Sequence, residues 1–174
     1  MEDLRYPTGR YTPPAEISAS QRDEWIEQIA AAPANLRQAV EDLSDQQLDR
    51  PYRVGGWTSR QITHHLPDSH LNAYVRFRLA LTEDTPIIKP YEESRWATLP
   101  DAKSAPIQSS LDLLEALHHR WVLLLTALSG ADYGRTFRHP ELGEISLDWT
   151  LGLYAWHGRH HTAQIQQLRK REDW

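Results

Sequence analysis

The sequence predicts an all-α protein built as an up-down four-helix bundle. Four long segments carry apolar residues at helical spacing, and segments containing proline or glycine separate them. The length of 174 residues suits one domain and is enough to bury a core without covalent cross-links. We therefore expect a single domain that spans residues 1–174.

Residues 1–17 are expected to form an extended N-terminal arm. They contain four residues that disfavour a helix, namely Pro7, Gly9, Pro13 and Pro14. The first helix should begin at Ser18 or Ser20, either of which can act as the N-cap. Its apolar residues recur on one helical face: Trp25, Ile29, Leu36, Val40 and Leu43. Pro33 lies within this pattern, so one long helix kinked at this proline is predicted.

The second helix has the clearest start in the sequence. It follows a connection from Ser44 to Gly56, and Thr58 and Gln61 have the spacing of a capping box. The helix is expected to run from Ser59 to about Leu81, with a bend at Pro67. Its inward side should carry Ile62, His65, Leu66, Ser69, Ala73 and Phe77.

A long loop is expected between the second and third helices, from Thr82 to Ala105, because this stretch lacks a helical period. Long loops in compact domains are often lids or binding loops, so Tyr91 and Trp96 are candidates for substrate contact. The third helix should then span residues 106–128 and end at Ser129-Gly130, a pair suited to a C-cap.

The C-terminal part predicts a small β-hairpin followed by the last helix. Residues 135–145 place Phe137 and Ile145 on either side of a turn sequence. The last helix is expected from Leu147 to Lys170, with basic residues near the C-terminal end of its dipole.

Composition excludes several classes of function. The chain has no cysteine, so disulfides, thiolate ligands and cysteine nucleophiles are ruled out. The first residues resemble no signal peptide, and no apolar stretch approaches the length of a membrane span. The net charge of -5, with both signs interspersed, does not resemble a nucleic-acid binder. We expect a cytoplasmic protein that binds neither membrane nor nucleic acid.

Histidine is the residue type that points to chemistry, since the chain has nine. His157 and His161 are four residues apart on a predicted helix, so their imidazoles share one face and can chelate one ion. His65, on the inward side of the second helix, is the best candidate for a third ligand, because His64 points about 100° away. Three imidazoles with an open position form the arrangement of a catalytic metal site.

The alternative is that these are buried, hydrogen-bonded histidines without a metal. A pair of histidines four residues apart is a weak signal, and spacing alone leaves both readings open. If a metal is bound, other polar groups should hold the imidazoles through their second ring nitrogens. The candidates within reach are Asp68, Asn72, His160 and Gln164.

Motifs along nearly the whole chain resemble the YfiT-type branch of the DinB-like proteins, which are described as metal-dependent hydrolases. The resemblance rests on Tyr6-Pro7, Gly9, Tyr11, Pro51-Tyr52-Arg53, Gly55-Gly56-Trp57-Thr58, His64-His65-Leu66-Pro67-Asp68-Ser69-His70, Asn72-Ala73-Tyr74, Arg76-Phe77, Arg120-Trp121, Gly152-Leu153-Tyr154, Trp156-His157 and His160-His161.

This resemblance implies an up-down four-helix bundle whose metal ligands are one histidine of the second helix and two of the last. Carried over by motif, these are His65, His157 and His161. It also implies one zinc or nickel ion per chain and a homodimer. This chain has Pro67 where family members often have alanine.

Three functions follow as hypotheses. The first is a metal-dependent hydrolase in which a metal-bound water attacks a small-molecule substrate. The second is a metal-dependent S-transferase that uses a low-molecular-weight thiol as cosubstrate, as better understood relatives in the wider fold group do. The third is a non-catalytic metal-binding stress-response protein. The sequence identifies no general base for the hydrolase.

Overall fold

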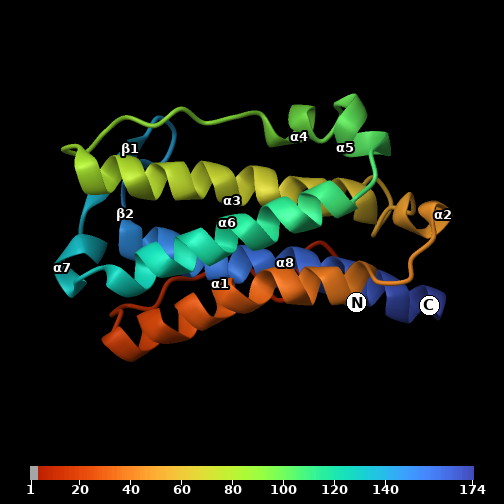
Figure 1. The fold of residues 1–174 in the computed structure, drawn as a ribbon, viewed down its shortest axis with the longest axis horizontal. Coiled ribbons are helices and arrows are strands. Elements are labelled where there is room, and N and C mark those ends of the chain that lie inside the picture. The colour runs from red at the N-terminus through yellow and green to blue at the C-terminus, as the bar shows by residue number, and fades with distance from the viewer. Residues whose placement is uncertain (1–3) are drawn as a thin grey trace.

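The computed structural model describes residues 4–174, and only the first three residues of the expected arm lie outside this range. Four long helices form the body of the molecule: α1 (Ala19–Val40), α3 (Ser59–Thr82), α6 (Gln108–Ala127) and α8 (Leu147–Glu172). They pack side by side along their length (Figure 1). The predicted four-helix bundle is confirmed.

The order of the helices around the bundle places the first and second long helices on opposite corners. Helix α1 packs against α6 and α8, and α3 packs against the same two helices. Helices α1 and α8 run in one direction, whereas α3 and α6 run in the other (Figure 1). Simple alternation would make α6 antiparallel to α3, but the connection over residues 83–107 returns along the length of α3 before α6 begins.

Helix starts follow from local capping. Ser18, the first of the two expected candidates, accepts a hydrogen bond from the Gln21 amide and caps α1. The capping box of Thr58 and Gln61 forms as predicted. Helix α8 begins after Ser146, whose side chain accepts a hydrogen bond from the Trp149 amide.

The connections contain short helices that the sequence pattern did not predict. They are α2 (Asp45–Leu48), α4 (Glu93–Trp96), α5 (Pro100–Ser104) and α7 (Gly130–Tyr133). A single turn is too short to show a helical period. The expected C-cap at Ser129-Gly130 is wrong, because Leu128 closes α6 and Ser129 instead caps α7 through a capping box with Asp132.

The predicted hairpin is confirmed as β1 (Thr136–His139) and β2 (Gly143–Ser146), which pair antiparallel. Phe137 faces Ile145 across the pair, and both belong to the hydrophobic core. The hairpin also holds the long connection, since the Ile88 amide donates to the Arg138 carbonyl and the Arg138 amide donates to the Pro86 carbonyl.

The N-terminal arm lies along α8 and is held by hydrogen bonds from it and to it. The Tyr11 hydroxyl donates to the Trp149 carbonyl, and the Trp156 indole donates to the Gly9 carbonyl. These contacts place residues 9–11 beside the first half of the last helix. In the part of the chain that the structure describes, no helix has the length and apolar character needed to cross a membrane.

Candidate metal centre

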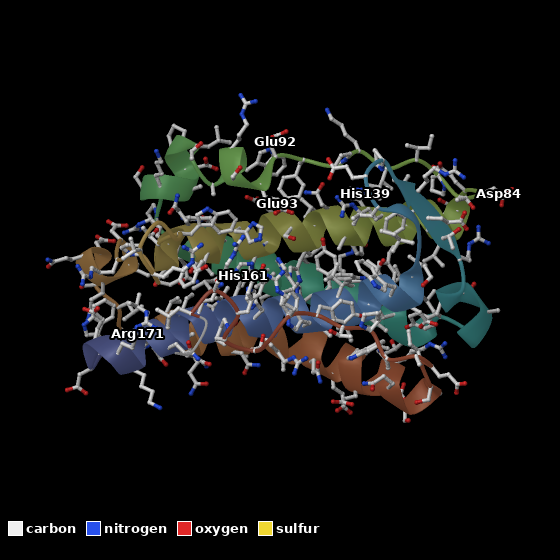
Figure 2. All side chains as sticks on the ribbon, turned by 180° about the vertical axis from the view of Figure 1, so that it is seen from behind. Asp84, Glu92, Glu93, His139, His161 and Arg171 are labelled. Carbon is white, nitrogen blue, oxygen red and sulfur yellow. The ribbon has the colours of Figure 1, made fainter. Side chains whose placement is uncertain are left out.

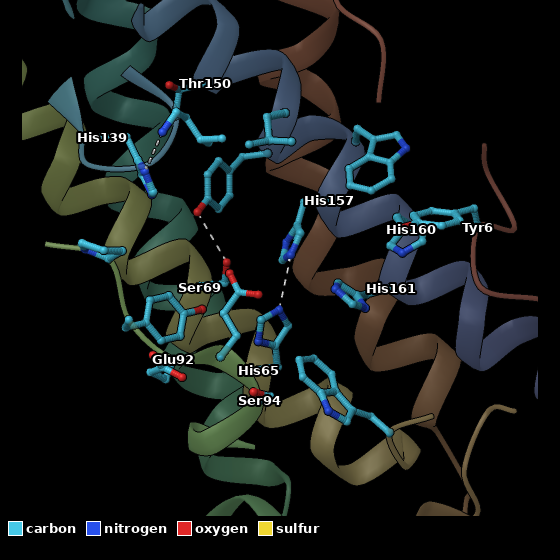
Figure 3. Close-up of a pocket in the computed structure, with 18 of the residues that line it drawn as sticks. Tyr6, His65, Ser69, Glu92, Ser94, His139, Thr150, His157, His160 and His161 are labelled. Carbon is cyan, nitrogen blue, oxygen red and sulfur yellow. Dashed lines mark hydrogen bonds between the residues drawn. The ribbon is translucent and has the colours of Figure 1, made fainter. Parts of the chain in front are cut away.

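Three histidines converge between α3 and α8. His65 projects from α3, and His157 and His161 project from successive turns of α8 towards it (Figure 3). The Nε2 atoms of His65 and His157 are 3.3 Å apart. One ring nitrogen from each of the three histidines lies within 4.8 Å of the other two. The helical spacing thus brings together the three imidazoles that the sequence singled out.

The separation of two nitrogens in this cluster fits a shared divalent ion, and the third nitrogen lies within 4.8 Å of both. Two nitrogens that each lie about 2.1 Å from a tetrahedral ion are roughly 3.4 Å apart, close to the 3.3 Å between the Nε2 atoms of His65 and His157. Imidazole nitrogens suit zinc, nickel, copper and iron. The donor set therefore matches a transition metal and not the oxygen-loving magnesium or calcium.

Burial keeps these imidazoles neutral, which is the form that coordinates a metal. Desolvation lowers the pKa of His65 to about 4. The pKa values of His157 and His161 lie well below the ordinary value, first through burial and then through the neighbouring histidines. At neutral pH all three lone pairs are available without release of a proton.

Gln164 orients His161 by a hydrogen bond to its Nδ1 atom. The Nδ1 atom of His161 is 2.9 Å from Gln164 Oε1, which can only accept, so Nδ1 carries the proton and Nε2 keeps its lone pair. The Gln164 amide nitrogen donates to the Arg5 carbonyl of the N-terminal arm and to Nε2 of His160. Two of the four expected neighbours, Gln164 and His160, therefore lie beside the cluster.

The other two expected neighbours do not contact the cluster. Asn72 donates from its side chain to the Asp68 carbonyl of its own helix. Asp68 is partly buried, and the charge of Asp101 acts on it. Within residues 4–174, neither side chain forms a hydrogen bond with His65, His157 or His161.

The histidine cluster lies in the wall of a cavity of about 780 Å³. The N-terminal arm, α3, the long connection, the hairpin and α8 all contribute to its lining. Tyr91 of the connection lines it. Trp96 does not line the cavity but packs on Tyr91, with ring centroids 4.5 Å apart.

Two residues that line the cavity or contact the cluster were missed by the sequence reasoning. Glu93 lines the cavity with an exposed side chain, and desolvation by its surroundings raises the pKa of its carboxyl, an effect that the charge of Arg76 opposes. It lies on the connection above α3 (Figure 2), where no helical period could place it. His70 lies behind His157, with its Nε2 atom 3.1 Å from His157 Nδ1. The only sequence signal for His70 was its place in the His64 to His70 motif. It lies on a different face of α3 from His65, so helical spacing did not connect the two.

Comparison with known proteins gives a consistent family. The model of the DinB superfamily matches residues 28–165. A protein from Bacillus cereus (strain 03BB102), named "Putative metal-dependent hydrolase", is 56% identical over the full length of both chains. A protein from Bacillus anthracis (strain CDC 684 / NRRL 3495) with the same name is 55% identical, also over the full length of both.

Two solved structures share the fold. YfiT from Bacillus subtilis, described as a probable metal-dependent hydrolase with an unusual four-helix bundle topology, superposes with a TM-score of 0.96 at 50% identity and covers 98% of each chain. The four-helix bundle protein TT2238 superposes with a TM-score of 0.58 at 20% identity, covering 84% of this chain and 98% of its own. The second likeness concerns the fold alone.

Proposed function

The chain belongs to the DinB superfamily, and from this membership and its three convergent imidazoles we propose that it is a metal-dependent hydrolase-like enzyme. His65, His157 and His161 would hold one divalent ion, either zinc or nickel. The observation that carries the proposal is the placement of three neutral imidazoles in the wall of a large cavity. Such an ion would act as a Lewis acid and lower the pKa of a water that it binds.

The cavity can receive a small molecule beside the histidines. Its volume of about 780 Å³ lies within the usual range for ligand sites, about 300–1,000 Å³. Trp57 borders the cluster, with its ring centroid 4.7 Å from that of His65. The apolar surface of Trp57 would limit the approach of solvent to the imidazoles from that side.

Glu93 would act as the general base that the sequence did not identify. It lines the same cavity as the three histidines, and its raised pKa brings its proton affinity closer to the operating pH. The charge of Arg76 acts in the opposite direction and favours the carboxylate form of Glu93. Glu93→Gln should then lower turnover about 100-fold or more while leaving the metal content unchanged. Glu27→Gln, an exposed change on α1, is the matched control and should leave turnover unchanged.

The proposal is tested by comparing two panels of substrates with zinc-loaded or nickel-loaded protein. In the first panel, esters and amides are supplied without a thiol, and the hydrolase predicts a product that depends on the metal. In the second panel, low-molecular-weight thiols are supplied with electrophiles. Product formed only when a thiol is present would replace the hydrolase by the S-transferase. Absence of product in both panels would favour the non-catalytic metal-binding protein.

The assembly and location of the protein belong to the same proposal. We propose that it acts as a homodimer in the cytoplasm, and that the substrate enters the cavity as a small molecule. Analytical ultracentrifugation of the purified protein tests the dimer, for which a mass near twice the 20.2 kDa of one chain is expected.

A further inference from the structure

A line of histidines leads from the candidate metal centre into the core of the bundle. His70 of α3 and His118 of α6 are buried, with 0% and 2% of their surface exposed. The Nδ1 atom of His157 is 3.1 Å from His70 Nε2, and His70 Nδ1 is 2.8 Å from His118 Nε2. The line ends where His118 Nδ1 lies 2.6 Å from the Ile29 carbonyl of α1. Each of the four long helices contributes one residue to this line.

The carbonyl at the end of the line sets the direction of every hydrogen bond in it. A carbonyl oxygen only accepts, so His118 Nδ1 carries a proton and His118 Nε2 is left as an acceptor. His70 must then donate from Nδ1, which leaves its Nε2 as an acceptor. His157 must in turn donate from Nδ1. The Nε2 atom of His157 therefore keeps its lone pair, and this is the nitrogen that lies 3.3 Å from His65 Nε2.

Pro33 makes the Ile29 carbonyl available. In an α-helix this carbonyl would accept from the amide of residue 33, but proline has no N–H. Ile29 is fully buried, so its carbonyl needs another donor. His118 supplies that donor. One contact thus satisfies the backbone group orphaned by the proline and fixes the tautomer of His118.

Aromatic side chains enclose the line and keep it neutral. The ring of Trp121 meets those of His70 and His118 edge to face, with centroids 6.0 Å and 5.9 Å away. Tyr154 packs on His70 with centroids 5.0 Å apart. Both rings are buried, and within residues 4–174 their nitrogens form hydrogen bonds only with each other, His157 and the Ile29 carbonyl, with no carboxylate among the partners. Each ring therefore has one donor and one acceptor, and every ring nitrogen of His70 and His118 has a partner.

We propose that His70 and His118 are positioning residues that hold His157 in the tautomer protonated at Nδ1, with the Ile29 carbonyl freed by Pro33 as the fixed end of the line. Their effect is to present the Nε2 lone pair of His157 to the metal centre before any ion arrives. The part of this inference that concerns metal affinity rests on the proposed metal site. The part that concerns the tautomer does not.

The tautomer is tested on metal-free protein by long-range ¹H–¹⁵N correlation spectra of the histidine rings. We expect His157, His70 and His118 all to be protonated at Nδ1 at neutral pH. A proton on Nε2 of His157 in the wild-type protein would overturn the proposal. The spectra determine the tautomer of His157 even if the protein binds no metal or has no hydrolase activity. A wrong tautomer assignment can therefore be distinguished from a wrong proposed function.

A pair of substitutions at His118 separates positioning from packing. His118→Gln keeps a polar atom that can accept from His70, whereas His118→Leu fills similar space but cannot accept. In His118→Leu, we expect His157 to populate the Nε2-protonated tautomer and the dissociation constant for zinc to rise about tenfold, the lower end for loss of a group that orients a ligand. In His118→Gln, both readouts should return towards the wild-type values.

His64→Leu provides a matched control, because His64 is also buried and hydrogen-bonded, but to Ser110 and the Ala105 carbonyl instead of the line. It should leave the His157 tautomer and the zinc affinity unchanged. A His118→Leu protein that folds, keeps the wild-type tautomer and binds zinc as tightly as wild type would contradict the proposal. An equal loss of zinc affinity in His64→Leu and His118→Leu would do the same, because it would reflect packing alone.

Discussion

The histidines of the cluster and the carboxyls of Asp68 and Glu93 have pKa values shifted by burial more than by neighbouring charges. Desolvation is the largest cause of the lowered pKa of each histidine in the cluster and of the raised pKa of Asp68 and Glu93. The two effects have one consequence, because both favour the uncharged form in the folded state. The cavity therefore presents neutral donors where a cation would bind.

Asp68 gives a prediction at this scale. Burial, with a contribution from Asp101, raises the pKa of its carboxyl from 3.8 to about 6. Between these values the folded protein holds a proton that the unfolded chain releases, so the contribution of Asp68 to stability falls as the pH rises from 3.8 to 6. At pH 8 the charged carboxylate is a cost, and Asp68→Asn should raise the free energy of unfolding by about 1 kcal/mol, allowing for solvent screening of a partly buried group.

Urea unfolding at pH 8 and at pH 4 measures this effect. The gain in Asp68→Asn should be present at pH 8 and nearly absent at pH 4, where the wild-type carboxyl is mostly protonated in the folded state. Asp84→Asn, at an exposed turn after α3, serves as the control and should change stability little at either pH. A gain of equal size at both pH values would show that the charge of Asp68 is not the cause.

The candidate ligands were predictable residue by residue, whereas the groups that orient them were predictable only in part. His157 and His161 follow from a spacing of four on a helix, and Gln164 lies three residues beyond His161 on the same helix. His70 and His118 could not be paired from sequence, because their contact depends on how α3 packs against α6. The Asn72 side chain likewise donates to the Asp68 carbonyl of its own helix. Sequence spacing cannot distinguish this local hydrogen bond from a contact with a metal ligand.

At the scale of elements, close packing of the arm and α1 against α8 depends on Gly152. A Cβ at this position would collide with the Tyr11 hydroxyl and approach the Trp25 ring to 2.8 Å. In an exposed helix, glycine to alanine would be stabilising, but here the added methyl has no space. We predict that Gly152→Ala lowers the free energy of unfolding by about 1–3 kcal/mol.

Chemical denaturation of Gly152→Ala beside Gly130→Ala checks this prediction. At Gly130 the nearest atom to a new Cβ is the end of the flexible Arg22 side chain, 3.9 Å away, so little change is expected. The Gly152 variant should also weaken the hold on the N-terminal arm, visible as faster amide exchange around Gly9, whose carbonyl accepts from Trp156. Wild-type stability in Gly152→Ala would contradict this prediction, because it would mean that Tyr11 and Trp25 move aside for the added methyl without loss of stability.

Long elements with caps were predictable, and single-turn elements were not. The capping box at Thr58 fixed the start of α3, since its two side-chain hydrogen bonds are local in sequence. Helices α4 and α5 have no side-chain cap and span four and five residues, so neither periodicity nor capping marks them. Their placement depends on tertiary contacts such as the hydrogen bond from the Gln61 side chain to the Ala97 carbonyl.

At the scale of the whole molecule, the direction of α6 places the line of histidines. Because α6 runs parallel to α3, His64 meets Ser110 near the start of both helices and His70 meets His118 further along. An antiparallel α6 would not keep these pairs in register. The sequence indicated four helices and a long connection but not the path of that connection, which is set by its pairing with the hairpin.

Buried histidines also determine how the whole protein responds to acid. Burial lowers the pKa of His65, His118 and His160 from 6.5 to about 4. As the pH falls from 6.5 to 4, the unfolded chain takes up protons that the folded protein does not, so stability is lost in this window. For a fully buried side chain such as His118, the loss is on the order of 2 kcal/mol between pH 7 and pH 5.

Free energies of unfolding of the metal-free protein, measured from pH 7 to pH 5, should therefore decline steeply. The opposite contributions of Asp68 and Glu93 reduce this decline but do not cancel it, because burial lowers the pKa of eight histidines and raises that of only these two carboxyls among the described residues. A stability that is flat across this range would mean that the histidines accept protons in the folded state.

The central claim is that His65, His157 and His161 together bind one divalent ion, and zinc titration of the purified chain by calorimetry tests it most directly. The wild-type protein and His64→Ala should each bind one zinc per chain, since His64 hydrogen bonds elsewhere. Alanine at any one of the three positions should abolish stoichiometric binding. Stoichiometric zinc with wild-type affinity in any of these three variants, or none in the wild-type protein, would contradict the account.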